Sequence, residues 1–459
     1  MSTESPRRVD VLAIGCGPFN LGLAALASTV DDLDLLVVDA RPEFRWHPGL
    51  MFDDATLQVS FLSDLVSLVD PTHPMSFLAY LADVDRLYPF LVRENFFPTR
   101  VEYEAYLLWV VERLGSLRWD TSVSEVHFDA ETDSFRVVVT SDGERSVIHA
   151  THVVCGVGTE PHLPRTLSTQ TLSARATARD ATGSPSLIHS SDYLGHRSRA
   201  HAAEAVTVIG SGQSGAEIVV DLLEANLAGG PAVRWWTRTG WFAPLDFTKL
   251  SLEMTTPAYM DYFHSLPEQT RDSVRAGHWQ FHKGISADTL ERLHDLLYRR
   301  QLAGKLPPVQ LRVGVSVTGL AEQPDGRLRI HARHDDTGAT IAHTADLVVA
   351  ATGYRPRSTS FLDPLDALMV RDSRGRPVIA DDHSVTMREG LDRRLFVANA
   401  EEHSHGVSSP NLDIGAVRNA RILNAVTGRE VYRLPGHTAF TTFGPGEDVI
   451  ELPLPQLGT

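Results

Sequence analysis

The stretch from residue 9 to residue 22, VDVLAIGCGPFNLG, decides how this chain folds. An apolar run leads directly into a glycine-rich loop, and a helical pattern follows. A glycine loop at a strand-to-helix turn lets the backbone approach a pyrophosphate, and the helix N-terminus favours its negative charge. The stretch therefore predicts a dinucleotide site with contacts from Gly15, Gly17, Pro18 and Asn20. Asn20 stands where the simple fingerprint has its third glycine.

A second stretch of the same kind, VTVIGSGQSG, spans residues 206–215. It again joins a β-type run to a helical pattern, which is the context that makes such a loop informative. One such loop is weak evidence, but two in one chain indicate an enzyme that passes electrons between two dinucleotides. The predicted contacts of the second loop are Gly210, Gly212, Gln213, Ser214 and Gly215.

The residues that end the next strand after each loop predict which dinucleotide that loop binds. The run at 35–38 ends in Asp39, and an acidic residue there suits an unphosphorylated ribose. The run at 233–236 has no acid at its end, and Arg238 just beyond it suits the 2′-phosphate of NADPH. The alternatives are that Asp39 is a turn residue and that Arg238 is a solvated charge.

Length and composition are those of a globular chain with room for two or three domains. The 459 residues are 42% hydrophobic and 22% charged, and the net charge of −16 argues against nucleic acid or anionic lipid as a partner. No apolar run approaches the ~18 residues that span a membrane, and the N-terminus is too polar for a signal peptide. Two cysteines, Cys16 and Cys155, cannot form a disulfide framework, so we expect a cytoplasmic protein.

The order of these patterns predicts an α/β fold with two Rossmann-like dinucleotide-binding domains and a small, mostly helical substrate-binding insertion. A Ser/Thr/Ala-rich stretch at 168–185 is predicted to be a loop or linker, and the Pro-rich tail at 445–459 is expected to be ordered only against a neighbour. The predicted division is 1–165 and 346–459 for the FAD-binding domain with its C-terminal tail, 190–240 and 306–345 for the NADPH-binding domain, and 241–305 for the insertion.

Eight short segments are more restrictive than the glycine loops. They are Trp46-His47-Pro48-Gly49, Leu57-Gln58-Val59-Ser60-Phe61-Leu62, Asp70-Pro71-Thr72, Ser76-Phe77, Glu102-Tyr103, Trp109-Val110, Pro244-Leu245-Asp246 and His405-Gly406-Val407-Ser408. Through them the chain resembles, nearly end to end, the microbial N-hydroxylating flavin monooxygenases of hydroxamate siderophore biosynthesis. The best-known members of that family act on lysine or ornithine.

The resemblance implies that NADPH reduces FAD, that O2 adds to the flavin, and that a C4a-hydroperoxyflavin passes its distal oxygen to a primary amine while NADP+ stays bound. Because the oxygen donor belongs to the cofactor, we expect neither a protein nucleophile nor a metal. By the same resemblance Gln58 lies near the flavin edge, and Trp46 and His47 cover the flavin ring. Ordinary core packing is the alternative for Trp46 and His47. The remaining implied cofactor contacts are Thr352, Gly353, Tyr354, Pro410 and Leu412.

The departures from the family fall on the substrate pocket, which also includes Leu65. The amino-acid hydroxylases carry a lysine, which pairs with the substrate α-carboxylate, where this chain has Ser63. They carry a binding Asn where it has Leu252, and usually Ser where it has Asp413. A pocket that lost a cation and gained an anion predicts a diamine, putrescine or cadaverine, whose distal ammonium pairs with Asp413. The alternatives are L-lysine as substrate, and drift at tolerant positions with Asp413 capping a helix.

The sequence argues against three other classes of function. Baeyer–Villiger and S-oxygenating flavoproteins share both loops, but the hydroxylase-specific segments at 46–51 and 405–408 argue against them. A flavin-bound redox sensor has no need of an NADPH-tuned loop together with a substrate pocket. His403 and His405 lack the surrounding ligand set of a metal site. The family resemblance suggests a small-molecule amine as partner and a homo-oligomer, a tetramer.

Overall fold

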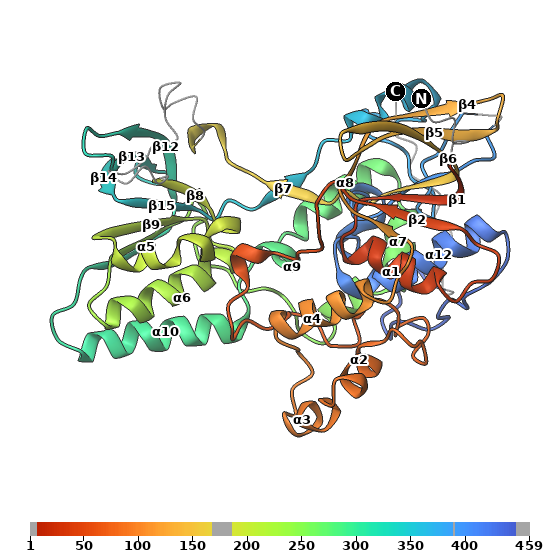
Figure 1. The fold of residues 1–459 in the computed structure, drawn as a ribbon. Coiled ribbons are helices and arrows are strands. Elements are labelled where there is room, and N and C mark those ends of the chain that lie inside the picture. Colours follow the sequence, from red (N-terminus) through yellow and green to blue (C-terminus); the bar gives the residue numbers. More distant parts are fainter. Residues whose placement is uncertain (1–6, 168–185, 389–390, 447–459) are drawn as a thin grey trace.

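The computed structural model describes residues 7–167, 186–388 and 391–446. The predicted linker at 168–185 and nearly all of the predicted tail at 445–459 lie outside the described residues. Two lobes, each built around its own sheet, are joined by a pair of short strands (Figure 1). We call the lobe that contains the first glycine loop the first lobe, and the other the second lobe.

The sheet of the first lobe is mostly parallel. Its strand order is β3 (Leu117–Arg118), β2 (Leu35–Val38), β1 (Arg7–Ile14), β6 (Glu144–Cys155), β5 (Ser134–Ser141) and β4 (Thr121–Asp129), with β17 (Leu395–Val397) beside β6. β1 pairs in parallel with β2 and β6, whereas β5 pairs antiparallel with both β6 and β4. Strand β1, which leads into the first glycine loop, therefore lies near the centre of the sheet, between β2 and β6.

Alternate residues of β1 face two different cores, because successive strand residues point to opposite faces. Val11 and Ala13 pack among buried residues of α1 (Pro18–Ala27), α4 (Arg100–Val111) and α12 (Gly415–Thr427). Leu12 and Ile14 pack on the other side, with β4 to β6 and the 3-10 segment Ser360–Leu368. The short helices α2 (Phe77–Asp83) and α3 (Leu87–Val92) project from the edge of this lobe (Figure 1).

The sheet of the second lobe is entirely parallel. Its strand order is β11 (Val309–Arg312), β10 (Ala232–Trp236), β9 (Ala205–Ile209), β15 (Leu347–Ala350) and β8 (Leu187–His189). Helices α6 (Gln213–Leu227) and α10 (Ala287–Leu302) cover one face, and a small antiparallel sheet covers the other (Figure 1). That small sheet consists of β12 (Val315–Glu322), β13 (Leu328–His334) and β14 (Thr340–Ala345). β15 follows residue 346, the predicted start of the returning FAD-binding part, yet it belongs to the second sheet.

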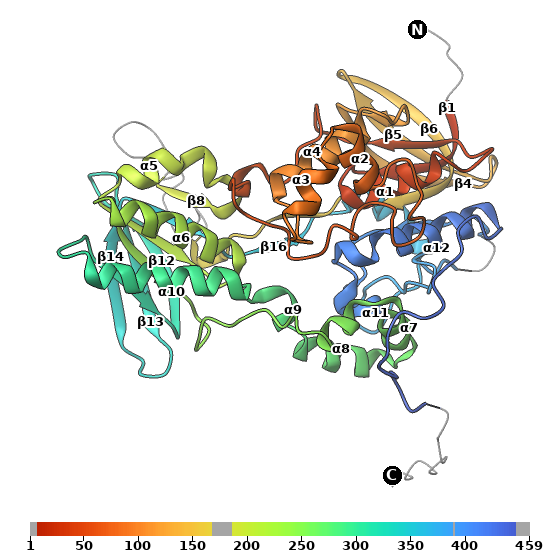
Figure 2. The ribbon, with the colours of Figure 1, turned by 90° about the horizontal axis from the view of Figure 1, so that it is seen from below.

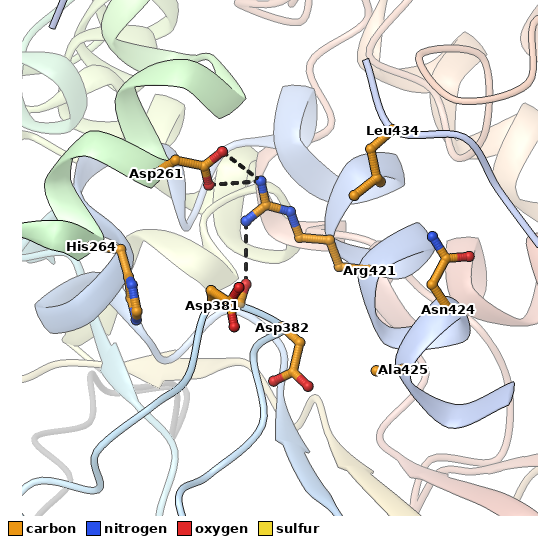
Figure 3. Close-up of a pocket in the computed structure, with 8 residues that line it drawn as sticks. All are labelled: Asp261, His264, Asp381, Asp382, Arg421, Asn424, Ala425 and Leu434. Atoms are coloured by element: carbon orange, nitrogen blue, oxygen red, sulfur yellow. Dashed lines mark hydrogen bonds and ion pairs between the residues drawn. The ribbon is translucent and has the colours of Figure 1, made fainter. Parts of the chain in front are cut away.

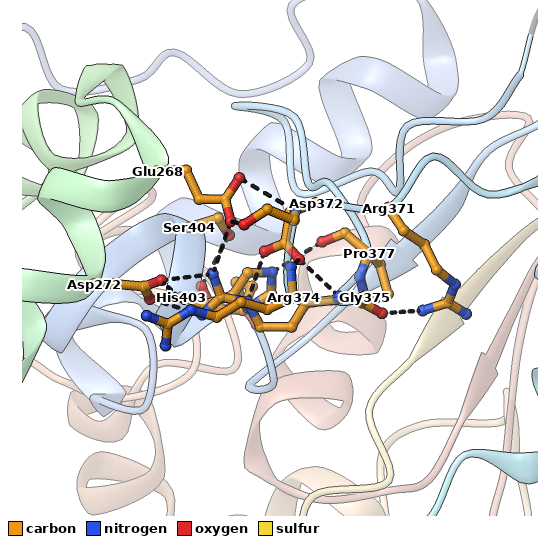
Figure 4. A network of polar contacts seen from close by, with 12 residues as sticks. Glu268, Asp272, Arg371, Asp372, Arg374, Gly375, Pro377, His403 and Ser404 are labelled. Atoms are coloured by element: carbon orange, nitrogen blue, oxygen red, sulfur yellow. Dashed lines mark hydrogen bonds and ion pairs between the residues drawn. The ribbon is translucent and has the colours of Figure 1, made fainter.

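The segment predicted as one helical insertion contributes to both lobes. Helices α7 (Pro257–Ser265) and α8 (Glu268–Gly277) lie along the first lobe, and the short α9 (Gln280–Lys283) lies between α8 and α10 (Figure 2). α8 is held there by Arg376, whose Nη1 lies 2.8 Å from Oδ1 of Asp272, and by Ser373, which donates to Glu268 at 2.6 Å. Figure 4 labels the two α8 residues of this network, Glu268 and Asp272. α10 instead packs on α6 of the second lobe.

Two short strands connect the lobes. β7 (Thr159–Pro161) leaves the first lobe, β16 (Tyr354–Pro356) returns to it, and the two pair antiparallel. Thr352 strengthens this junction, because its hydroxyl donates to the carbonyl of His162 at 2.5 Å. The predicted cofactor residues Thr352, Gly353 and Tyr354 thus lie where the chain passes between the lobes.

Candidate active site

The first glycine loop has the shape of a pyrophosphate cradle. Gly15 has a φ of +90°, and a Cβ there would lie 2.7 Å from the carbonyl oxygen of Gly156. Gly17 is the N-cap residue of α1, Pro18 is the first residue of the helix, and no side chain caps it. The free N–H groups of this first turn are the donors that a phosphate needs. Asn20 has a structural task, since its Nδ2 donates to the carbonyls of Gly15 (2.7 Å) and Ile14 (3.2 Å).

Asp39 stands at the end of β2, as predicted, but its carboxylate already has partners. Oδ2 accepts from the N–H of Cys16 at 2.6 Å and from Nη2 of Arg41 at 2.9 Å. Oδ1 accepts from the N–H and Nε of Arg41 at 2.8 and 3.0 Å. These bonds offset the cost of burial and lower the pKa of Asp39. A ribose hydroxyl would have to share or replace the Arg41 contact.

The second glycine loop is built in the same way. A Cβ at Gly210, whose φ is +123°, would lie 2.1 Å from the carbonyl oxygen of Ala351, and one at Gly215 would lie 2.6 Å from that of Gly210. Gly212 is the N-cap residue of α6, and its position provides no side-chain cap. The side chain of Gln213, however, turns away toward α10, where its Oε1 accepts from the N–H of Ser286 at 2.8 Å. The N–H groups of Gln213 and Ser214 open the helix and remain the part that can meet a phosphate.

Arg238 is exposed and lies beside the second loop. The residues on either side of it, Thr237 and Thr239, contact the hydroxyl of Ser211 at 2.9 and 3.1 Å. They also contact each other at 2.7 Å, so this turn is fixed against the glycine loop. A positive charge at this place, on an arginine free to bend toward the loop, fits a 2′-phosphate.

A row of aromatic rings crosses from the first lobe to the second. Centroid distances are 5.3 Å for Tyr103–Trp46, 5.1 Å for Trp46–His47, 6.2 Å for His47–Tyr354 and 5.3 Å for Tyr354–His189. His47 has left-handed backbone angles (φ +49°) and an exposed side-chain surface. Desolvation by the surrounding atoms, with the charge of Arg100, still lowers the pKa of His47 to about 4.

Two observations make the site fit to receive flavin and nicotinamide dinucleotides. A Cβ added at Gly17 or at Gly212 would meet no atom within 4 Å, so open space adjoins both loops. Nε2 of Gln58 is buried and has no hydrogen-bond partner among the described residues. A buried amide without a partner is costly, which fits a donor reserved for a polar ligand atom.

The predicted substrate residues Ser63 and Asp413 meet. The Ser63 hydroxyl donates to Oδ1 of Asp413, and the Thr255 hydroxyl lies 3.4 Å from Oδ2 while donating to the Leu252 carbonyl at 2.8 Å. Burial raises the pKa of Asp413, and these two hydroxyls only partly oppose it. Among residues 7–167, 186–388 and 391–446, Asp413 forms no ion pair. No side-chain cap is seen on the 3-10 turn Leu412–Ile414 or on α12, so Asp413 does not act as a helix cap.

The other residues predicted for this region do not all lie at one site. Pro18, Leu65 and Leu412 line one small cavity of about 10 Å³, next to Tyr103. Leu252 enters the site through its backbone carbonyl, which accepts from Thr255, and Pro410 is exposed at the surface.

A larger hollow, of about 530 Å³, lies elsewhere on the first lobe (Figure 3). It contains Arg421, paired with Asp261 at 2.7 Å, and none of the predicted site residues. His403 and His405 have other partners: Nε2 of His403 lies 2.9 Å from the carbonyl of Pro377, and Nδ1 of His405 lies 2.8 Å from the Ser404 hydroxyl. Within the described ranges no three histidines, cysteines or carboxylates are arranged to hold a metal.

Two residues that line the site were not predicted. Tyr103 is fully buried, contacts Trp46, and donates to the carbonyl of Ser63 at 3.2 Å, so it joins the flavin side to the substrate side. Thr255 supplies the second hydroxyl near Asp413. Tyr103 had a signal in the restrictive pair Glu102-Tyr103, but Thr255 belonged to a segment in which only Leu252 stood out.

Each glycine loop packs against the chain just before a linker strand, Gly15 against Gly156 and Gly210 against Ala351. Two dinucleotide-binding loops placed in this way define a pyridine-nucleotide-dependent flavoprotein. Comparison with known proteins narrows this class. The family model described as L-lysine 6-monooxygenase/L-ornithine 5-monooxygenase matches residues 7–356. The putrescine N-hydroxylase of Shewanella oneidensis is 36% identical over 438 residues, which are 95% of this chain and 84% of that protein. The chain belongs to the L-lysine 6-monooxygenase/L-ornithine 5-monooxygenase family.

Solved structures agree. The FAD-bound cadaverine monooxygenase of the desferrioxamine pathway from Erwinia amylovora is 36% identical, with a TM-score of 0.88 over 96% of this chain and 99% of that one. The ornithine N-hydroxylase from Kutzneria sp. 744, with reduced FAD, NADP+ and L-ornithine, is 26% identical, with a TM-score of 0.83 over 92% and 99%. The predicted family, α/β fold and cofactors FAD and NADPH are thereby confirmed, and the chain is a flavin-dependent monooxygenase. Among the described residues, no helix is both long and apolar enough to cross a bilayer.

Proposed function

We propose that this enzyme uses FAD, NADPH and O2 to N-hydroxylate one end of an aliphatic diamine, cadaverine or putrescine. The observation that carries the proposal is Asp413, a largely buried carboxylate whose neighbours are two hydroxyls and no cation in the described chain. The diamine substrates named for the relatives from Shewanella and Erwinia support it. The desferrioxamine pathway named for the latter also supports a role in hydroxamate siderophore biosynthesis.

The charge of the pocket favours a diamine over L-lysine. Oδ1 of Asp413 accepts from Ser63, but Oδ2 has only the long Thr255 contact, so it can accept a strong bond from a substrate ammonium. The α-carboxylate of lysine would lie near the same anion, and Ser63 offers it no positive partner. Like charges in a poorly solvated pocket repel strongly, which disfavours the amino acid.

The other site residues have proposed tasks of binding and orientation. The N–H groups that open α1 and α6 bind the two pyrophosphates, and Arg238 selects the phosphorylated ribose. Trp46 and His47 shield the reaction centre from water, and Gln58 donates to the flavin edge. Gly353 and Tyr354 lie at the linker, and Leu412 lines a small cavity together with Pro18 of the first loop. Pro410, although exposed, is proposed as a further cofactor contact. Bound FAD supplies the oxygen transfer, and the reacting amine must be neutral because an ammonium has no lone pair.

A substrate panel tests the proposal directly. Purified enzyme with FAD and NADPH is given C3 to C6 diamines, L-lysine and L-ornithine, and hydroxylamine product is measured rather than NADPH loss. We expect product from cadaverine or putrescine at a kcat/KM at least about tenfold above that of lysine. A clear preference for L-lysine would support the lysine N6-monooxygenase alternative. Ketone or thioether oxidation without amine hydroxylation would favour the other flavin monooxygenases.

We also propose that the enzyme forms a homo-oligomer through α2, α3 and the residues after them. None of the residues of α3 is buried, and Tyr88, Leu91, Val92 and Phe96 are 77, 65, 77 and 68% exposed. An isolated short apolar helix has little reason to persist unpacked. Light scattering should show an assembly that Leu91→Glu weakens; a monomer at every concentration would contradict this.

The buried free thiols of Cys16 and Cys155 support a cytoplasmic location.

A further inference from the structure

Arg100 of the first lobe and Glu217 of the second lobe form a two-pronged ion pair. Nη2 of Arg100 lies 2.6 Å from Oε1 of Glu217, and Nη1 lies 2.8 Å from Oε2. The two side chains are only 14% and 10% exposed. A buried pair with this geometry is directional and is little screened by salt.

Each partner is fixed to an element that carries a cofactor segment. Arg100 is the first residue of α4, and its Nη1 also donates at 3.0 Å to the carbonyl of Leu50, within the segment 46–51. Glu217 lies one turn into α6, and its Oε1 accepts from Nε2 of Gln213 at 2.9 Å. Gln213 is the first residue of α6, directly after the second glycine loop. The pair therefore connects the segment 46–51, which is predicted to lie at the flavin, to α6, the helix that follows the predicted NADPH-binding loop.

Other contacts between the lobes are of a different kind. A Cβ at Gly49 would lie 1.6 Å from the carbonyl oxygen of Ser191, so the segment 46–51 already touches the second lobe closely. Arg292 of α10 pairs with Asp54 of the first lobe, but both side chains are exposed, at 42% and 58%. Exposed pairs of this kind contribute little, so the buried Arg100–Glu217 pair is the polar contact suited to fix an orientation.

We propose that Arg100 and Glu217 are positioning residues that set the second glycine loop relative to the segment 46–51, and so set how NADPH and FAD meet. Neither side chain is assigned a contact with the amine. The inference rests on the proposed function only for its kinetic readout. Loss of the pair should loosen the angle between the lobes even in the enzyme without cofactors.

Glu217→Gln tests this, because it keeps the size of the side chain and removes its charge, and Arg100→Met tests the other partner. Spin labels on Glu131→Cys and Glu322→Cys, both exposed and in different lobes, report the distance between lobes. The native thiols Cys16 and Cys155 are buried and will not take the label. Arg292→Ala, which removes the exposed pair, is the matched control.

We expect Glu217→Gln and Arg100→Met to broaden the label-distance distribution of the cofactor-free protein, and Arg292→Ala to leave it narrow. With cofactors, flavin reduction by NADPH should slow by about ten- to a hundredfold and less hydroxylamine should form per NADPH, with little change in the diamine KM. Unchanged distances and unchanged reduction in folded variants would overturn the proposal. If the wild type hydroxylates no diamine, the distance and reduction measurements still decide it.

Discussion

The hydroxyl of Ser63 donates a hydrogen bond to Oδ1 of Asp413 across 350 positions of sequence. The contact joins the segment before α2 to the segment before α12, and it leaves Oδ2 with only a 3.4 Å contact from Thr255. A carboxylate that is hydrogen-bonded at one oxygen and nearly free at the other is suited to accept a hydrogen bond from an ammonium group of a ligand. The proposed role of Asp413 can therefore be tested from either side of this bond.

Replacing Asp413 with Ser should raise the diamine KM by about ten- to a hundredfold, because a charge-assisted hydrogen bond contributes ~1.5–3 kcal/mol. The NADPH-dependent reduction of the flavin should change little, because Asp413 is not assigned to either dinucleotide. Steady-state hydroxylamine formation gives the first quantity and stopped-flow absorbance the second. Asp363→Ser, at an exposed acid on the 3-10 segment Ser360–Leu368, is the control for the lost charge. An unchanged KM in Asp413→Ser would remove Asp413 from the substrate site.

Replacing Ser63 with Lys should be more harmful to diamine turnover than replacing it with Ala. A lysine ammonium at this place would pair with Asp413 and take the position proposed for the substrate ammonium. Ser63→Ala removes one hydroxyl donor and should raise the diamine KM only about three- to tenfold. FAD content of each variant shows whether the fold is intact. Equal KM values for the two variants would contradict a cation site at Asp413.

Asp413 should also make the substrate-free enzyme less stable as the pH rises. Burial raises the pKa of Asp413 in the folded state above the ordinary value of about 3.8, which holds in the unfolded state. At a pH between the unfolded-state and the folded-state pKa, the folded state therefore binds more protons than the unfolded state. The free energy of unfolding therefore falls as the pH rises through this window. Asp413→Asn removes the titration, so this variant should be the more stable one at pH 8, with the difference shrinking toward pH 4. Denaturant unfolding at pH 4.5, 6 and 8 measures it, and an Asn variant no more stable than wild type at pH 8 would refute it.

The parts of the fold that the sequence predicts well are those that depend on neighbours in the chain. The run at 9–22 predicts a strand, a glycine turn and a helix, and β1 and α1 lie there because each step follows from local geometry. The position of Asp39 at a strand end is local in the same sense. Its bonds to Arg41 and Cys16 were not predicted, because an acid at a strand end can serve its own chain as well as a ribose.

The parts that could not be predicted depend on packing between distant segments. Gln213 belongs to a phosphate-loop pattern, but its side chain is directed by Ser286, 73 positions away on the N-terminal end of α10. Thr255 reaches Asp413 across 158 positions. The segment 241–305 was predicted as one mostly helical insertion, yet α10 packs its apolar residues Leu293 and Leu296 against α6 of the second lobe. Tertiary contacts determine where these side chains and helices lie, and a local sequence pattern does not predict such contacts.

Replacing Arg238 with Ala should abolish the preference for NADPH over NADH. Arg238 is exposed, and Thr237 and Thr239 hold its turn against Ser211 of the second glycine loop. A guanidinium bound to a 2′-phosphate contributes ~1.5–3 kcal/mol, so the NADPH KM should rise by about ten- to a hundredfold. The NADH KM should stay nearly constant, because that ribose carries no phosphate. Arg299→Ala, an exposed arginine on α10, controls for the loss of one positive charge. If Arg238 is only a solvated charge, the KM values for NADPH and NADH will change by similar amounts in Arg238→Ala and in Arg299→Ala. General electrostatic attraction does not depend on which exposed arginine is removed.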